Sequence, residues 1–224
     1  MSSEEIIYLG DFEIHLVKNL RAKHVLLKQN TKGEIVLTCP RFCTKGRAIR
    51  FAETQLPWIK AHLQYAPKEI IFCPEMSVSL LGKSYCLKSG KRTEVIDGVL
   101  FISGESSFFH RRVCSYAQKI LLPYIQNKAQ QFAQELEVHV GRITLRNTSS
   151  RWGSCSSTKN LSFCWKIAFA PLNVIDYLVA HEVAHLAHMN HSPHFWATVD
   201  SLIDKRKEAE HWLKTNGRQL QRIR

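Results

Sequence analysis

The sequence lacks a long apolar run, because no segment approaches the ~20 residues that a membrane-spanning helix needs. Its first ten residues, MSSEEIIYLG, lack the basic and apolar regions of a secretory signal peptide. The seven cysteines are odd in number and include no C-x-x-C pair, which fits reduced thiols better than a disulfide framework. Cys39 and Cys43 have no second pair to complete a zinc knuckle, so we expect them to be packing residues. These absences predict a cytoplasmic protein with no membrane partner.

Acidic residues are also scarce. The 224 residues carry 19 Asp and Glu against 31 Lys and Arg, a formal net charge of +12. Polyanions are attracted to such a chain, so nucleic acid stays open as a partner, although the basic residues are scattered and indicate solvated faces rather than one dedicated groove. A hydrophobic content of 45% predicts a folded globular protein with a sizeable core.

Residues 1–105 are expected to form a β-rich N-terminal module that contains a helix. Short β-rich segments flank the turn NTKG at 30–33, and two more meet at Asp97-Gly98, which are both hairpin signals. Between them, Thr44 can cap a helix that runs to about Leu63, with Pro57 either kinking it or dividing it in two.

Residues 106–224 follow a different pattern. A helical periodicity from Ser106 to about Leu136 contains Pro123, which should bend or interrupt it. RITLRN alternates like a strand, TSSRWGSCSSTKN is a polar loop, and LSFCWKIAFA is a more apolar strand. Two helices are then expected, from about residue 172 or 173 to His188 and from Ser192-Pro193 onwards. The whole chain is therefore predicted to be of the α+β class.

The stretch HEVAHLAHMNHSPH at 181–194 holds five of the chain's eleven histidines. His181, Glu182 and His185 form H-E-x-x-H within an apolar helical pattern. Four residues of helix turn about 400° and rise about 6 Å, so the two imidazoles lie one above the other on one face and can share a zinc ion. Glu182 lies about 100° around the helix, where it can take a proton from a metal-bound water as general base without being a ligand.

A third ligand must come from beyond this helix. His191 would face away on a continuous helix, but a helix end at Met189-Asn190 and a new start at Ser192-Pro193 would turn it back towards the metal. His194 in the next helix is a competing candidate, and a distant acidic residue is another. His188 fits a role at the helix end or beside a ligand.

The stretch from residue 150 to 196, SRWGSCSSTKNLSFCWKIAFAPLNVIDYLVAHEVAHLAHMNHSPHFW, resembles the YgjP-like metallopeptidase domain family, a group of zincin-type proteins. The segments RAKHVLLKQNTKGEIVLTCP, WIKAHL and LLGKSYCL also resemble it, so the similarity covers most of the chain. It implies that His181, His185 and His191 bind zinc and that Glu182 is catalytic. It also implies a zincin-like domain at 106–224, built from an H-E-x-x-H helix and an antiparallel sheet. More remotely, the family is similar to the SprT and WLM proteins, some of which cleave protein crosslinked to DNA.

The family's RWGSC segment at 151–155 has two interpretations. Arg151 could contact an anionic substrate group or an oxyanion, because guanidinium groups suit such oxygens. Trp152 and Gly153 could instead fix a tight turn and pack beside the metal helix, and we favour this structural role. Cys155 is not expected to be a nucleophile. The strand predicted at LSFCWKIAFA either accepts an extended peptide as an added strand or is an ordinary core strand.

The leading hypothesis is a zinc-dependent hydrolase, a metallopeptidase in which Glu182 activates a metal-bound water that attacks a peptide or protein substrate. One alternative is a metal-dependent nucleotide pyrophosphatase or phosphohydrolase, which ranks lower because the sequence has no P-loop. Another is a basic nucleic-acid-associated module with structural zinc, although three histidines would leave a coordination position open. Three imidazoles can also accept another divalent transition metal. The sequence does not indicate an oligomeric state.

Overall fold

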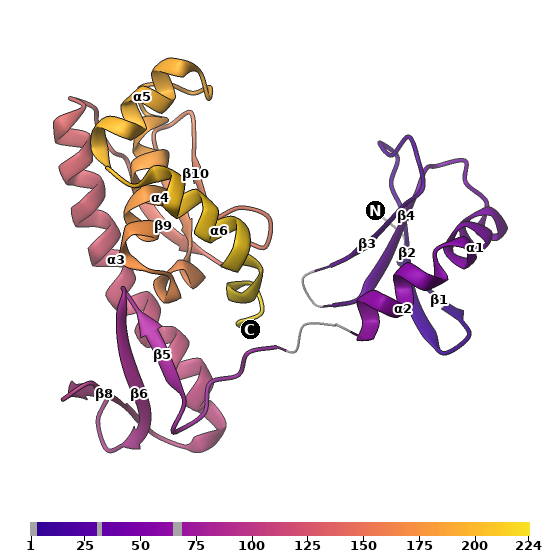
Figure 1. The fold of residues 1–224 in the computed structure, drawn as a ribbon, viewed down its shortest axis with the longest axis horizontal. Helices are drawn as coiled ribbons and strands as arrows, with labels where there is room; N and C mark the ends of the chain where they lie inside the picture. The colour runs from indigo at the N-terminus through magenta and orange to yellow at the C-terminus, as the bar shows by residue number, and fades with distance from the viewer. Residues whose placement is uncertain (1–3, 31–32, 65–68) are drawn as a thin grey trace. The chain divides into compact units, whose positions relative to one another are not determined.

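A computed structural model of the chain describes residues 4–30, 33–64 and 69–224. The chain divides into two compact units, Met1–Ile70 and Ile71–Arg224 (Figure 1). Both units combine strands with helices, so the α+β class is confirmed.

The first unit is a four-stranded sheet with two helices. The strand order is β1-β2-β4-β3, in which β2 and β4 run parallel and the other neighbours run antiparallel. The hairpin expected around residues 30–33 is therefore confirmed as β3 and β4. The elements are β1 (Glu4–Leu9), β2 (Phe12–Lys18), β3 (Leu26–Gln29), β4 (Ile35–Cys39), α1 (Lys45–Thr54) and α2 (Leu56–Gln64).

Capping and proline chemistry decide where the two helices of this unit begin. The Thr44 hydroxyl accepts a hydrogen bond from the backbone N–H of Arg47 at 3.3 Å, as an N-cap should. Pro57 is the second residue of α2, and only Gln55 separates α2 from α1, so the division at this proline is confirmed. Cys39 and Cys43 are buried in the apolar core of this unit, as expected for packing residues.

The second unit begins with another four-stranded sheet, of order β5-β6-β8-β7. Its strands are β5 (Ser77–Leu80), β6 (Lys83–Gly90), β7 (Glu94–Ile96) and β8 (Val99–Ser103). Asp97 and Gly98 have φ of 47° and 77°, which closes β7 and β8 into the expected hairpin. The backbone N–H of Leu81 also donates to the Ala168 carbonyl at 2.9 Å, and β8 packs against the long helix that follows. These contacts join the sheet to the second unit, so the division falls after Ile70 and not at the expected residue 105.

The long helix α3 (Phe109–Glu135) follows a short 3-10 helix, η1 (Ser106–Phe108). The sequence predicts that Pro123 bends or interrupts this helix; the interruption is wrong, because the helix continues through the proline. Leu121 and Ile125, on either side of Pro123, are fully buried. Burial of this apolar face offsets the roughly 3 kcal/mol that an internal proline costs a helix.

A three-stranded sheet of order β10-β11-β9 follows α3. Its strands are β9 (Ile143–Arg146), β10 (Gly153–Cys155) and β11 (Leu161–Cys164). Three details differ from the prediction. β10 lies within the segment expected to be a polar loop. Of the strand expected at LSFCWKIAFA, only LSFC is a strand, because the next residues form a 3-10 helix, η2 (Trp165–Phe169). β9 also pairs parallel with β11, in a sheet expected to be antiparallel. The residues of η2 are all buried, and continuous burial suits a helical turn as well as a strand.

Three helices complete the second unit: α4 (Leu172–Ala184), α5 (Pro193–Leu202) and α6 (Arg206–Leu220). α4 packs against α3, α5, α6 and β10, which explains why it is apolar nearly all round. It ends at Ala184, four residues earlier than expected, and His185 is its C-cap. Ser192 accepts a hydrogen bond from the backbone N–H of Phe195 at 3.3 Å, so the predicted cap of the next helix is confirmed.

Candidate metal centre

Three histidines meet where α4 ends. His181 lies in the last turn of α4 and His185 caps it, so helical spacing sets both rings on one side. The chain then reverses before α5, which brings His191 back to the other two. One ring nitrogen from each of His181, His185 and His191 lies within 4.8 Å of the others. The structure thus brings together all three histidines that the sequence selected.

The spacing of these nitrogens suits a shared cation. Nε2 of His181 and Nε2 of His191 are 3.2 Å apart. A tetrahedral zinc ion with Zn–N bonds of about 2.1 Å holds its nitrogens about 3.4 Å apart. Three imidazoles can bind zinc or another divalent transition metal. With only three protein ligands, a tetrahedral ion keeps one coordination position open. The three residues therefore fit a catalytic rather than a closed structural metal site.

The ring of His185 is oriented by the backbone. Its Nδ1 lies 3.1 Å from the carbonyl oxygen of His188, which can only accept, so Nδ1 carries the proton and donates. Nε2 is then left with a lone pair directed at the cluster, as a metal ligand requires. His188 therefore contributes its backbone at the helix end, in line with the role expected for it.

Burial keeps two of the three rings neutral. Desolvation, together with the neighbouring His185 and His191 rings, lowers the pKa of His181 to about 4. Desolvation likewise lowers the pKa of His185. Nδ1 of His181 is buried and has no hydrogen-bond partner among the described residues. At neutral pH both rings are consequently unprotonated, the form that binds a metal.

The sequence did not reveal what supports these rings. Phe195 is completely buried, and its ring centroid lies 5.0, 4.5 and 4.8 Å from those of His181, His185 and His191. Trp196 stacks on His191 at 5.5 Å and 22°. Both aromatic residues belong to the first turns of α5. The sequence did hold one indication of this role. The helix predicted to start at Ser192-Pro193 carries Phe195 and Trp196 in its first turn, directly after His191.

Glu182 is the buried carboxyl group beside the cluster, with 5% of its surface exposed. It packs against the backbone of β10 at Gly153, where an ideal Cβ would lie 2.7 Å from both Cγ and Cδ of Glu182 and nearer still to Oε1. Desolvation raises the pKa of Glu182 to about 7, and the charge of Arg151 acts in the opposite direction. A carboxyl group of this pKa can both accept and release a proton near neutral pH.

The RWGSC segment lies against Glu182. Trp152 packs on α6, where an ideal Cβ at Gly217 would lie 3.2 Å from its Cζ2. Arg151 is exposed, yet its charge reaches Glu182. Burial and the charge of Glu182 raise the pKa of Cys155, which disfavours the thiolate that a nucleophile needs. The packing of Gly153 beside the metal helix, expected from the structural interpretation of this segment, is confirmed by its contact with Glu182 of α4. An isolated glycine in a strand is often a sign of such a close approach.

The other sequence candidates lie outside this cluster. His194 is exposed, and its nearest described ring partner is His188, at 6.3 Å between centroids. Within the described part of the chain, the cluster of metal-binding groups contains neither His194 nor an acidic residue. β11 is paired on both sides, so it is a core strand and cannot accept a peptide; β10 and β9 are the strands at the two edges.

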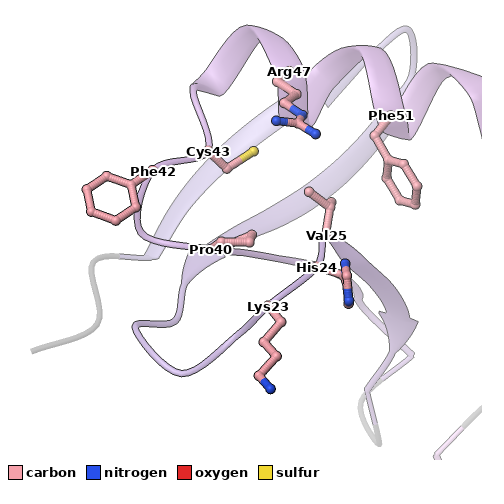
Figure 2. A pocket seen from close by; sticks show the side chains of 8 residues that line it. All are labelled: Lys23, His24, Val25, Pro40, Phe42, Cys43, Arg47 and Phe51. Atoms are coloured by element: carbon pink, nitrogen blue, oxygen red, sulfur yellow. The ribbon is translucent and has the colours of Figure 1, made fainter.

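The first unit has a hollow of about 390 Å³ whose lining mixes apolar and basic side chains (Figure 2). No group of metal-binding residues is found there among the residues described. Across the same residues, none of the helices has the length and apolar character that a membrane crossing needs. The lining of the hollow consists of Lys23, His24, Val25, Pro40, Phe42, Cys43, Arg47 and Phe51.

Comparison with known proteins gives a family match that spans residues 23–216 and is described as YgjP-like, metallopeptidase domain. Two solved structures are similar to part of the chain, each at 18% identity. The crystal structure of the metallopeptidase zymogen of Pyrococcus abyssi abylysin has a TM-score of 0.39 and covers 41% of this chain and 93% of its own. The crystal structure of the metallopeptidase zymogen of Methanocaldococcus jannaschii jannalysin has a TM-score of 0.36; the match covers 42% of this chain and 96% of the jannalysin chain. No curated protein matches the chain.

The family match includes the three clustered histidines, the buried glutamate and the RWGSC segment. It extends over most of both units. The chain therefore belongs to the YgjP-like family of metallopeptidase domains, and the metal-dependent hydrolase expected from its histidines is confirmed.

Proposed function

We propose that the chain is a zinc-dependent peptidase in which His181, His185 and His191 bind the ion and Glu182 is the general base. The observation that carries the proposal is the convergence of three imidazole nitrogens within 4.8 Å of one another, beside a carboxyl group that is 5% exposed. Zinc in such a site supplies Lewis acidity, which makes water a nucleophile at neutral pH.

Glu182 moves the proton. Its carboxylate accepts a proton from the attacking water and returns it to the amine that leaves when the peptide bond breaks. A pKa of about 7 suits both steps, because the group is neither too weak a base nor too weak an acid at neutral pH. Packing against Gly153 restricts where the carboxylate can lie.

The free edge of β10 favours a peptide as the substrate. The Trp152 carbonyl accepts from the Cys164 N–H at 2.8 Å, and the Ser156 N–H donates to the Asn160 carbonyl at 2.9 Å. By the alternation of an antiparallel pair, the backbone groups of Gly153 and Cys155 point to the other side, where no described strand pairs. An extended peptide can add there as a strand, directly beside Glu182.

Arg151 is proposed as a contact for an anionic substrate group or for the oxyanion that forms during attack. Its exposed side chain is close enough to Glu182 for its charge to lower the pKa of that carboxyl group. A guanidinium donates to a developing negative charge without itself losing a proton.

A reducing compartment is proposed for the protein, as the sequence predicted. All seven cysteines are free, including pairs such as Cys39 and Cys43 that lie in one core. Free thiols persist in the cytoplasm, where disulfides are rare.

The experiment is a comparison of Glu182→Gln with Glu94→Gln, which removes an exposed carboxylate from β7. Zinc-loaded wild-type protein should cleave an unfolded protein substrate. Glu182→Gln should retain zinc but lose roughly 10²- to 10⁴-fold in kcat/KM, the usual contribution of a general base, whereas Glu94→Gln should match the wild type. Full activity of Glu182→Gln would exclude it as the base. Hydrolysis of nucleoside triphosphates but not of unfolded protein would instead favour the phosphohydrolase alternative.

A further inference from the structure

A groove of about 960 Å³ lies over the β10-β11-β9 sheet, at the upper end of the roughly 300–1,000 Å³ of ligand pockets. Three arginines and a set of hydroxyl groups line it. We call it the arginine groove and define it by Arg142, Arg146, Arg151, Thr144, Ser154 and Ser162.

Strand register explains why the hydroxyl groups gather here. Ser154 of β10 is paired with Ser162 of β11, and Ser162 is paired with Thr144 of β9. Residues paired in this way point to the same face of a sheet, so the three hydroxyl groups form one row across all three strands. The alternate residues Leu161 and Phe163 are buried on the opposite face. The row of hydroxyl groups therefore lies on the face opposite to the Leu161 and Phe163 side chains, a face that buried Cys164 also shares at the end of β11.

Arginines flank this row. Arg142 precedes β9 and Arg146 ends it, two residues either side of Thr144, so both share the face of the hydroxyl groups. Both are exposed, and neither guanidinium has a hydrogen-bond or ion-pair partner among the described residues. Cations held in structural ion pairs would be neutralised, whereas these are available to a ligand.

The groove is also free of opposing charge. No acidic side chain belongs to its lining within the described chain. The sequence has no Asp or Glu between Val138 and Ile175, a stretch that would carry about three at the chain's average frequency. Guanidinium, hydroxyl and amide donors without carboxylates form a surface that recognises anions.

The groove and the candidate active site share strand β10 but lie on opposite faces of its sheet, because Gly153, whose Cβ would point at Glu182, alternates with Ser154, which points into the groove. The two meet at the edge of β10. Arg151 and Cys155 belong to its lining, and Glu182 interacts electrostatically with both. Gly153, between them in the chain, packs directly on Glu182. The distance across three strands is about 10 Å, the length of roughly three extended residues. A chain that lies in the groove can thus also reach the free edge of β10.

We propose that the arginine groove is an exosite for acidic segments of protein substrates, which recruits stretches rich in Asp or Glu to the neighbouring active site. The inference rests on the proposed peptidase function for the identity of its ligand. A single-stranded nucleic acid is the less suitable occupant, because no aromatic side chain for base stacking lines this groove in the described chain.

The test measures binding without cleavage. A fluorescent extended peptide with glutamate at every second position is compared, by anisotropy on the full-length metal-free protein, with the same peptide carrying glutamine. The glutamate peptide should bind roughly tenfold tighter, and added salt should remove the difference. The double variant Arg142→Gln/Arg146→Gln should weaken its binding by roughly fivefold to thirtyfold, as expected for two partly exposed charge pairs.

The control is Arg92→Gln/Arg111→Gln, which removes the same charge from two exposed arginines outside the groove and should leave binding within about twofold. Equal binding of the two peptides, or an equal loss in the control variant, would overturn the proposal. So would tighter binding of labelled single-stranded or duplex DNA that depends on Arg142 and Arg146, because the groove would then be a nucleic-acid face.

A second arm separates this proposal from the proposed function. Zinc-loaded wild type and the Arg142→Gln/Arg146→Gln variant are given acidic and neutral unfolded substrates of equal length. The ratio of kcat/KM for acidic over neutral substrate should fall in the variant, and an unchanged ratio would contradict the exosite. If the wild type cleaves neither substrate but binds the glutamate peptide through these arginines, the peptidase assignment fails and the anion site stands.

Discussion

Replacement of Gly153 by alanine tests whether the position of Glu182 matters for catalysis. An ideal Cβ at residue 153 would lie 2.7 Å from Cγ and Cδ of Glu182. Ordinary carbon contacts are about 3.5 Å or longer, so the glutamate side chain must move by about 0.7–1 Å. Glu182 is only 5% exposed, which leaves it little space for such a movement.

The expected effects follow from that displacement. A misplacement of about 1 Å in a reacting group costs on the order of 10²-fold in rate. The added methyl group should also destabilise the second unit by about 1–3 kcal/mol, or roughly 2–12 °C in Tm. Metal content should not change, because the three atoms nearest to the new Cβ all belong to Glu182 and none belongs to a histidine.

The assay combines cleavage of an unfolded protein, elemental analysis and thermal denaturation. Gly46→Ala is the matched control, because a Cβ at Gly46 in α1 would meet nothing within 4 Å. Gly46→Ala should keep full activity, and its free energy of unfolding should rise by up to about 1 kcal/mol, because alanine favours a helix more than glycine does. Wild-type turnover by folded, metal-loaded Gly153→Ala would refute the reasoning, since Glu182 would then tolerate displacement.

Two further predictions concern the histidine cluster. Phe195→Leu removes the ring that contacts all three imidazoles, so zinc affinity measured by chelator competition should fall by about 10- to 100-fold in a folded protein; an unchanged Kd would contradict this role. In metal-free folded protein the pKa of His181 is about 4, whereas in the unfolded chain it is 6.5. The contribution of His181 to the free energy of unfolding therefore decreases as the pH falls from 6.5 to 4. The pKa of Glu182 is about 7 against 4.5, so its contribution decreases as the pH rises from 4.5 to 7. The two contributions change in opposite directions with pH, and Glu182→Gln removes one of them. Between pH 4.5 and 6.5, the Tm measured in the presence of a chelator should therefore rise more steeply with pH in Glu182→Gln than in the wild type. Equal slopes would count against these pKa shifts.

Local rules predicted the features of the site that depend on neighbouring residues. Helical periodicity places His181 and His185 on one side of α4, and the Ser192-Pro193 signal starts α5 where the structure starts it. Together these rules required the chain to reverse between the two helices. That reversal brings His191 to the other histidines without any information from distant parts of the chain.

Contacts between distant segments could not be predicted in the same way. Gly153 was expected to pack beside the metal helix, but the partner it meets there, Glu182, lies in a different element and leaves no periodic pattern in either segment. β10 has only three residues, too few for alternation to distinguish a strand from a loop. The parallel pairing of β9 with β11 depends on the path of the connecting chain, which residue patterns do not specify.

The same limitation explains the differences in domain division and in the long helix. Strand signals grouped β5 to β8 with the first unit, although their packing on α3 and η2 places them in the second. The local preference of Pro123 argued for a break, but burial on both sides of it kept α3 continuous. In both cases tertiary packing decided the outcome against a local signal.

The most direct test of the metal centre is the metal content of protein purified without an affinity tag. Wild-type protein should contain about one transition-metal ion per chain. His194→Ala, a neighbouring exposed histidine outside the cluster, should keep that ion, whereas His191→Ala should lose most of it. A His191→Ala protein that retains a full complement of metal would contradict the coordination by His181, His185 and His191 on which the proposed chemistry depends.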